Sequence, residues 1–292
     1  MGAEMIKLEA SGGDALRYTA KNEGLPGGHL ENSSFDLDNA DNKGIVLDLK
    51  NPAGVEVLLK LLETADIFLT NVRAKSLEKL ELDYETLKER FPALVYGIVT
   101  GYGDKGPDKD MPGFDFTAFF ARGGWTGALY EPGSMPLTPV PGLGDHQAGM
   151  YLAAGVAAAL LKAKTKGVGE RVSVSLFHSA IYGVSLMLTS AQYGAAAAKY
   201  PQSRRQAANP LTTAYKTKDE RFIQIAVPAY NALFNNFVKA IGREDLVDHP
   251  VYATQQTVGE RMPEVYDLVA EAIAGGTVAE WAELFTKTDI PY

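Results

Sequence analysis

The sequence predicts an α/β fold, with a doubly wound parallel sheet in the first part of the chain and a smaller α+β domain after it. Two observations favour this class. Short β-branched runs alternate with helical patterns through the first part, and a hairpin pattern followed by amphipathic helices occupies the remainder. We therefore expect a first domain over residues 1–200 and a second over residues 201–292.

Strands are expected where β-branched and apolar residues form short runs, at residues 5–8, 44–48, 66–70, 94–100 and 171–175. Helical patterns separate most of these runs, at residues 52–63, 84–91, 146–164 and 176–193. Pro52 suits a first helical turn, Asp83 is an expected N-cap, and Gly167 is expected to end the long third helix. Because strands and helices alternate, the strands should run parallel with helices packed on the sheet.

Two segments interrupt this alternation. Residues 101–144 are rich in glycine, proline and aromatic residues, and loops of this length in compact domains are usually functional or disordered. Residues 201–209 form a polar linker. Beyond it, the pattern predicts a hairpin over residues 212–227, turning at Lys218 and Asp219, and helices near residues 229–241 and 262–273.

Composition excludes several functional classes. The hydrophobic share of 46% and the charged share of 22% are those of a soluble globular protein. A net charge of −8 gives no overall attraction to nucleic acid or anionic lipid, so we expect neither as a partner. The absence of cysteine and of histidine pairs at i, i+4 leaves no local metal signature, so we expect no metal. No long apolar run or signal-peptide pattern is present, which favours a cytoplasmic protein without a membrane segment.

The segment Gly101–Gly106 matches the pattern G-x-G-x-x-G and follows an expected strand. In a dinucleotide-binding fold this pattern leads straight into a helix whose N-terminus faces the pyrophosphate. Here Pro107 and Pro112 follow, so no helix can begin promptly. A plain glycine-rich loop is favoured, and an NAD-dependent oxidoreductase stays as an alternative.

Asp145 is a candidate catalytic residue because it lies where a long helix is expected to begin, next to Gly144. It can be an N-cap, which is the commoner role for aspartate. It can also be a covalent nucleophile. The neighbouring glycine would let a substrate approach the carboxylate closely, and the helix N–H groups would stabilise an oxyanion. His146 can be a general base, a cap or a packing residue. Asp115 can hold backbone amides in a turn or be a second acid/base group.

Asn71, Val72 and Arg73 follow a strand at its carboxyl end, where open α/β sheets bind ligands. Arg73, with Lys75 and Lys79 just beyond it, is a candidate phosphate contact. The alternative is a basic helix face exposed to water, and the residues alone do not separate the two.

Several motifs together resemble those of the class III coenzyme A-transferases, over essentially the whole chain. They are Gly2–Glu9 with Gly13 and Asp14, Leu47–Lys50, Asn71–Arg73, Leu94–Tyr96, Gly101–Gly103 with Gly106 and Pro107, Pro112–Asp115, Gly144 and Asp145 with Gly149, and Thr165–Ser175. Within that family, Phe119–Gly124 and Ser175–Tyr182 are most similar to the 2-hydroxyacyl-CoA transferases of amino-acid-fermenting anaerobes, of the 2-hydroxyisocaproate and phenyllactate type. Compared with these relatives, the chain looks truncated at both ends.

The resemblance implies a Rossmann-like large domain with a smaller one, incomplete here, and a homodimer interlocked as linked rings. It places the nucleophile at Asp145, which would form an acyl anhydride and then an aspartyl-CoA thioester. It places CoA contacts at Asn71, Val72, Arg73 and Lys79. Asp115, Gly144 and His146 would support the site.

The substrates implied are an acyl-CoA and a small carboxylic acid, with no permanently bound cofactor and no metal. We expect the aromatic residues Phe119, Phe120, Trp125 and Tyr130 to meet the side chain of the acid. Two alternatives stay open, an acyl-CoA racemase and a fragment that keeps the fold without activity. Racemases that resemble this chain carry histidine where Phe114 stands.

Overall fold

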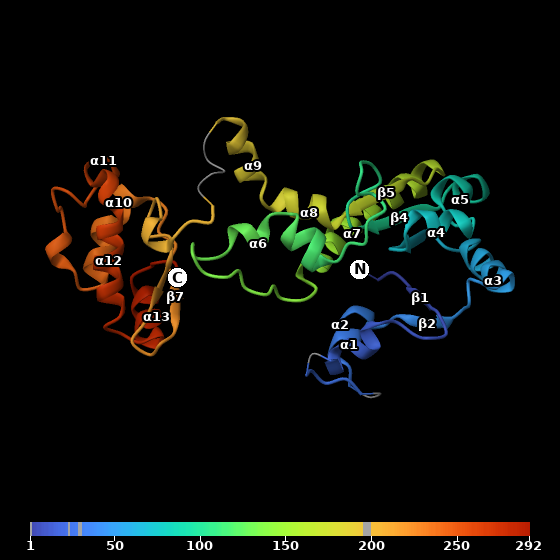
Figure 1. Ribbon diagram of the computed structural model, residues 1–292, viewed down its shortest axis with the longest axis horizontal. Coiled ribbons are helices and arrows are strands. Elements are labelled where there is room, and N and C mark those ends of the chain that lie inside the picture. The colour runs from blue at the N-terminus through green and yellow to red at the C-terminus, as the bar shows by residue number, and fades with distance from the viewer. Residues whose placement is uncertain (1, 23, 29–30, 195–199) are drawn as a thin grey trace. The chain divides into compact units, whose positions relative to one another are not determined.

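The computed structural model describes residues 2–22, 24–28, 31–194 and 200–292 (Figure 1). They divide into two compact units, one made of residues up to 123 with residues 140–182, and the other of residues 124–139 with residues 183–292. The second unit thus includes part of the glycine- and proline-rich stretch. A boundary after residue 200 between independently folding domains stays a prediction.

The first unit contains five strands, all in parallel pairs, which confirms the α/β class. They are β1 (Ile6–Glu9), β2 (Lys43–Val46), β3 (Ile67–Thr70), β4 (Val95–Thr100) and β5 (Arg171–Ser175). β1 pairs with β2 in one sheet, with Ile6 opposite Lys43, and β3, β4 and β5 pair in that order in another. Ile67 lies opposite Val95, and Tyr96 opposite Arg171.

The helices of this unit include those expected over residues 52–63, 84–91 and 146–164, and several that were not expected. They are α1 (Leu16–Asn22), α2 (Ser33–Asn39), α3 (Pro52–Leu62), α4 (Ala74–Lys79), α5 (Tyr84–Arg90), the π-helical turn η1 (Asp115–Ala121), α7 (Leu143–Lys166) and α8 (Leu176–Gly183). Asp83 caps α5 by accepting the Thr86 N–H, and Gly167 ends α7 with a φ of 69°, both as expected.

Side chains of β4 alternate between two apolar layers, as a strand with helices on both faces requires. Tyr96 and Ile98 pack with leucines of α3, α4 and α5. Val95 packs on the other face against Leu152, Val156, Ala159 and Ala163 of α7. A Cβ on Gly97 would lie 3.1 Å from a Val156 methyl carbon, so this glycine lets α7 approach the strand closely.

The glycines of the stretch after β4 have a structural explanation. A Cβ on Gly101 would lie 2.8 Å from the Gly113 Cα, so the two backbones touch at that point. Gly103 and Gly106 both have positive φ, 93° and 88°. In the described chain the next helical element after Gly106 is η1, so no helix N-terminus stands where a dinucleotide-binding loop would need one.

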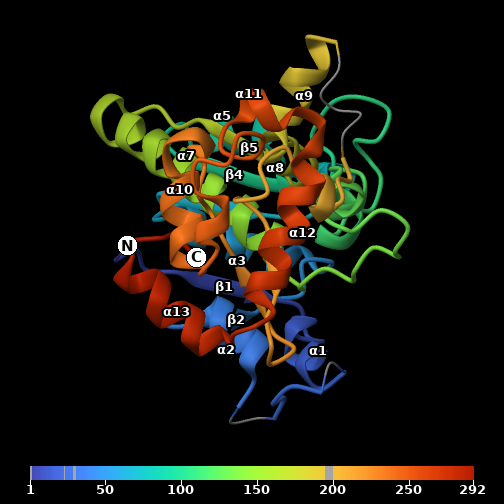
Figure 2. The same ribbon diagram turned by 90° about the vertical axis from the view of Figure 1, so that its left-hand side faces the viewer.

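The second unit is a small α+β assembly with an apolar core of its own, and its helices α10, α12 and α13 are labelled in Figure 2. Its elements are α6 (Trp125–Ala128), α9 (Ser185–Gln192), the antiparallel strands β6 (Ala214–Lys216) and β7 (Phe222–Gln224), α10 (Tyr230–Ala240), α11 (Gln255–Val258), α12 (Met262–Ile273) and α13 (Val278–Lys287), with short 3-10 turns η3 (Arg204–Gln206), η4 (Glu244–Leu246) and η5 (Gly259–Arg261). The hairpin, α10 and α12 confirm expectation.

The expected single helix over residues 176–193 is wrong, because the structure breaks it at Val184 into α8 and α9. At the break, a Cβ on Gly183 would lie 2.5 Å from Trp125 Cζ2, so the indole occupies the space beside the backbone. α13 was not expected, although Thr277 and Glu280 form a capping box that the sequence displays.

Candidate active site

The start of α7 differs from the expected one, and the difference concerns Asp145. The helix begins at Leu143 and its N-cap is Gly142, with a left-handed φ of 79°. Asp145 therefore lies in the first helical turn and is not the N-cap. The Asp115 carboxylate explains the shift, since its Oδ2 accepts the Gly142 N–H at 2.7 Å and fixes the cap residue.

Gly144 lets η1 lie directly against this first turn. It is buried, and a Cβ there would lie 2.6 Å from Phe119 Cγ and 3.0 Å from Asp115 Cβ. No larger residue fits without moving the ring or the helix. The structure thus brings Asp115, Gly144 and Asp145 together, a proximity that sequence spacing could not supply.

The Asp145 carboxylate is exposed and accepts no side-chain hydrogen bond recorded among the described residues. Desolvation by the surrounding protein raises its pKa to about 6, and the negative charge of Asp115 acts in the same direction. Because the Asp145 side chain is exposed, its desolvation is partial. Repulsion from Asp115 raises the Asp145 pKa as well, independently of desolvation. A carboxylate that is reachable, unpaired and not fully stabilised as an anion is suited to attack an electrophile.

Asp115 has a different environment. It is buried, and its Oδ1 and Oδ2 each accept a backbone N–H at 2.7 Å, from Phe116 and Gly142 respectively. These bonds fit the interpretation of Asp115 as a residue that holds backbone amides. They engage both oxygens, so its contribution to Asp145 is positional and electrostatic.

His146 follows Asp145 on α7, and its side chain is exposed. Its Nε2 lies 3.1 Å from Oδ1 of Asp38, on α2. The His146 N–H also donates to the Gly142 carbonyl at 2.8 Å, the first hydrogen bond of the helix. The residue thus borders the candidate nucleophile while its ring contacts an acid far away in sequence.

The turn Asn71–Arg73 lies at the carboxyl end of β3, as expected. The Thr70 hydroxyl accepts the Val72 N–H at 3.1 Å, and Arg73 is the N-cap of α4 without a side-chain cap. Lys75 forms an ion pair with Asp110 at 2.8 Å, whereas no ion pair among the described residues involves Arg73 or Lys79. Arg73, at the carboxyl edge of the sheet, and Lys79, at the end of α4, are therefore available to an anionic ligand.

The expected lining by Phe119 and Phe120 is wrong. Both rings are buried in the core of the first unit, with centroids 5.2 Å apart in an edge-to-face arrangement. Phe119 supports Gly144 from below instead of facing a substrate. Phe119 therefore packs against the first turn of α7, and Phe120 packs against Phe119.

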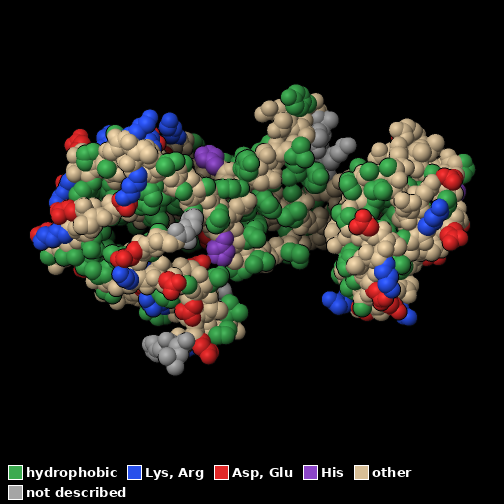
Figure 3. Space-filling model, turned by 180° about the vertical axis from the view of Figure 1, so that it is seen from behind, with side chains coloured by type: hydrophobic (Ala, Val, Ile, Leu, Met, Phe, Trp, Pro, Cys, Tyr) green, Lys and Arg blue, Asp and Glu red, His purple; other side chains and the backbone are tan. Residues whose placement is uncertain are grey.

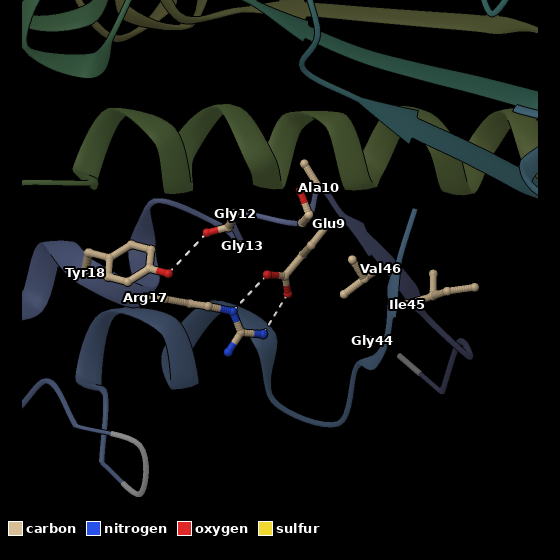
Figure 4. Close-up of a pocket in the computed structure, with 10 residues that line it drawn as sticks. Glu9, Ala10, Gly12, Gly13, Arg17, Tyr18, Gly44, Ile45 and Val46 are labelled. Atoms are coloured by element: carbon tan, nitrogen blue, oxygen red, sulfur yellow. Dashed lines mark hydrogen bonds and ion pairs between the residues drawn. The ribbon is translucent and has the colours of Figure 1, made fainter. Parts of the chain in front are cut away.

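Sequence reasoning missed an open pocket of about 360 Å³ at the carboxyl end of β1 (Figure 4). Its lining includes the glycine-rich loop after β1 and residues 44–46 of β2. Within it, the Arg17 guanidinium binds both oxygens of Glu9, at 2.7 and 2.8 Å, and the Tyr18 hydroxyl donates to the Gly12 carbonyl. Gly12 and Gly13, which follow an expected strand within a few residues, are the sequence feature that could have indicated this pocket.

Glu9 is expected to make the first unit sensitive to acid. Its hydrogen bond with Arg17 holds its pKa at about 2, although burial opposes this. A depressed pKa contributes stability that is present above the unfolded value of about 4.5 and lost as pH falls toward 2. Glu9→Gln should lower the free energy of unfolding by about 2 kcal/mol at pH 7, measured by urea denaturation, and flatten its decline between those pH values.

The matched control for Glu9→Gln is Glu63→Gln, because Glu63 and Arg90 form an exposed ion pair at 3.9 Å. Exposed pairs contribute little, so this variant should leave the denaturation curve almost unchanged. Equal losses in the two variants would contradict the role given to the Glu9–Arg17 ion pair.

Within the described residues, no three histidine, aspartate or glutamate side chains cluster as metal ligands, and no helix has the length and apolarity needed to cross a bilayer. Basic and acidic side chains are mixed on the face drawn in Figure 3. That face offers no extended basic surface of the kind that binds a phosphate backbone.

Comparison with known proteins decides the family. The model of CoA-transferase family III matches residues 1–292. The chain belongs to CoA-transferase family III. It is 51% identical to the cinnamoyl-CoA:phenyllactate CoA-transferase of Clostridium sporogenes, covering 100% of this chain and 71% of that protein. It is 44% identical to the (R)-2-hydroxy-4-methylpentanoate CoA-transferase of Clostridioides difficile, covering 100% and 72%.

Solved structures agree with this assignment. A crystal structure of a hypothetical protein from Mycobacterium tuberculosis superposes with a TM-score of 0.82 at 28% identity, covering 99% of this chain and 75% of that one. A CAIB/BAIF family protein from Brucella suis shares the fold, with a TM-score of 0.80 at 23% identity, covering 99% and 76%. This family III CoA-transferase is therefore an enzyme whose substrates are CoA thioesters. The family assignment replaces the NAD-dependent alternative.

Proposed function

We propose that this CoA-transferase moves coenzyme A between an acyl-CoA and a free 2-hydroxy acid, with Asp145 as the covalent nucleophile. The observation that carries the proposal is the exposed Asp145 carboxylate in the first turn of α7, with its raised pKa and its lack of a hydrogen-bonded partner among the described side chains. The names of two similar proteins, which act on phenyllactate and on (R)-2-hydroxy-4-methylpentanoate, support the substrate class.

The overall reaction replaces one thioester with another, so its free-energy change is close to zero. An Asp145 oxygen attacks the donor thioester carbonyl, and CoA thiolate leaves to give a mixed anhydride. The thiolate then attacks the aspartyl carbonyl, which releases the donor acid and forms an aspartyl-CoA thioester. The carboxylate of the acceptor attacks this thioester, thiolate leaves again, and its attack on the acyl carbonyl yields the new acyl-CoA and free Asp145.

The start of α7 supplies the electrostatic stabilisation that each tetrahedral intermediate needs. The first N–H groups of a helix have no acceptor within the helix, and the helix dipole favours negative charge there. α7 is 24 residues long, and the N–H groups of Leu143, Gly144 and Asp145 precede its first internal hydrogen bond, from the His146 N–H to the Gly142 carbonyl. Developing oxyanions can therefore be met by backbone donors close to Asp145.

We assign the CoA phosphates to the turn Asn71–Arg73 and to Lys79. Arg73 carries charge at the carboxyl edge of the sheet, Lys79 carries charge at the end of α4, and Lys75 is already paired with Asp110. Guanidinium and ammonium groups both bind phosphate well. These are the contacts that the family resemblance implies.

We also propose a homodimer. Several large apolar side chains of the second unit are exposed, among them Leu137 at 80%, Leu186 at 80% and Tyr193 at 86%. Contact with a second copy of the chain would cover such side chains where they lie together.

Direct assay tests the proposed activity. The protein is incubated with cinnamoyl-CoA and phenyllactate, with 2-hydroxy-4-methylpentanoate and with lactate as alternative acceptors, and products are resolved by liquid chromatography. We expect transfer to the larger 2-hydroxy acids without ATP or added metal. In heavy water, a 2-methylacyl-CoA should take up no deuterium at its α carbon. Uptake of deuterium without transfer would assign a racemase instead.

A further inference from the structure

Asp38 and His146 join two elements of the first unit that lie 108 residues apart in sequence. Asp38 is in the last turn of α2, and its Oδ1 lies 3.1 Å from the His146 Nε2 on α7. Both side chains are partly exposed, at 41% and 53%. An exposed pair of this kind contributes little to stability, so its placement next to Asp145 asks for another explanation.

The His146 ring is held on two sides. Asp38 contacts its Nε2, and the ring also lies close to Gly142, where a Cβ would be 3.5 Å from His146 Cε1. Gly142 is itself fixed by its hydrogen bond to Asp115. The imidazole therefore has a defined position over the N-cap, one residue from the candidate nucleophile.

α2 is anchored well enough to hold Asp38 in place. Asn32 caps the helix by accepting the Phe35 N–H at 3.0 Å, and its amide donates to the Arg17 carbonyl at 2.9 Å. The Arg17 guanidinium lies over the Phe35 ring, 3.8 Å from its centroid. These contacts connect α2 to α1 and to the Glu9 ion pair.

Three titratable groups act on Asp145: Asp115 on η1, His146 on α7 and Asp38 on α2. The two acids repel the Asp145 charge, and His146 attracts it when protonated. The attraction by His146 exceeds the repulsion by Asp38.

We propose that Asp38 is a positioning residue that holds the His146 imidazole beside Asp145, so that its cationic form offsets the repulsion by Asp115 and keeps the nucleophile ionised. The inference rests on the proposed function for its meaning in catalysis. The electrostatic relation itself is a property of the free protein.

The test measures the Asp145 titration directly, by carbon-13 NMR of the full chain labelled at aspartate carboxyl carbons, with Asp145→Asn to assign the signal. His146→Gln should raise the Asp145 pKa by about half a unit, because the cation is lost. Asp38→Asn should also raise it, because the ring is released. In the His146→Gln background, Asp38→Asn should leave the pKa unchanged or lower it, because only the repulsion by Asp38 remains to be removed.

The change of sign in the Asp145 pKa shift distinguishes a positioning role of Asp38 from a direct effect of its charge. Equal shifts by Asp38→Asn in the two backgrounds, or no shift in His146→Gln, would overturn the proposal. The matched control is Asp41→Asn, which removes the same charge just beyond α2, at a residue with no hydrogen bond or ion pair among the described residues and with a φ of 61° that asparagine tolerates. It should not move the titration.

Activity gives the second readout. The acid limb of the pH profile of kcat/KM should follow the NMR values, with kcat/KM at pH 5.5 lowered about two- to threefold in His146→Gln and little changed at pH 8. If Asp145→Asn retains transferase activity, the proposed nucleophile fails while the NMR relation stands. If the NMR relation fails and Asp145→Asn is inactive, only the positioning role is lost.

Discussion

Asp145→Asn is expected to lower kcat by about four orders of magnitude or more, because an amide cannot form the acyl anhydride or the aspartyl thioester. Binding of CoA should persist, since the proposed phosphate contacts lie on other elements. Stability should not fall, because Asp145 is not the helix cap and its charge is disfavoured in the folded protein. Steady-state kinetics, calorimetric titration with CoA and thermal denaturation measure the three quantities.

Chemical trapping identifies the residue independently of the variant. Hydroxylamine added with acyl-CoA should convert the wild-type enzyme to an aspartyl hydroxamate, located by mass spectrometry in the peptide that contains Asp145. Asp115 should stay unmodified, because it is buried and both of its oxygens accept backbone hydrogen bonds. A hydroxamate at Asp115, or near-native turnover by Asp145→Asn, would refute the assignment.

Turnover should also depend on pH in a defined direction. The proposed nucleophile is the ionised Asp145 carboxylate, and the pKa of Asp145 is raised to about 6. Below that pH, kcat/KM should decline about tenfold per unit as Asp145 is protonated. Above it, this group should impose no further dependence.

Gly144→Ala has the second largest expected effect. The added Cβ would lie 2.6 Å from Phe119 Cγ, in a place where Phe119 is fully buried, so α7 or η1 must move. Overpacking of this kind destabilises by about 1–3 kcal/mol. Displacement of the first turn of α7 should also lower kcat about a hundredfold, since catalysis depends on sub-ångström placement of the nucleophile. Thermal denaturation and kinetics measure both.

The same substitution at Gly149, on the same helix, is the control. A Cβ there meets no atom within 4 Å, and alanine favours the helical conformation by about 1 kcal/mol over glycine. Gly149→Ala should therefore raise the melting temperature. If both variants destabilise the protein equally, the contact between Gly144 and Phe119 does not explain the loss.

Most elements of the first unit could be predicted from local sequence patterns. The alternation of β-branched runs with amphipathic segments was sufficient to locate β1 to β5, α3 and α5, because side-chain periodicity is a property of each segment alone. The Asp83 cap and the Gly167 terminator were predictable for the same reason. α1 and α2 were missed because they are short and polar, and their stability comes from contacts such as the stacking of Arg17 on Phe35.

The candidate site divides along the same line. Asp145 stood out in the sequence because an acid beside glycine at an expected helix start is chemically distinctive, and the family resemblance pointed to the same residue. Its helix position was misjudged because Asp115, 27 residues away from the cap residue Gly142, moves the start of α7. Three features of the site depend on segments that are distant in sequence. They are the burial of Phe119 and Phe120, the proximity of Asp115 to Asp145, and the pairing of Asp38 with His146. Periodicity and spacing hold no information on such contacts, because they arise only when the packed layers bring separate elements together.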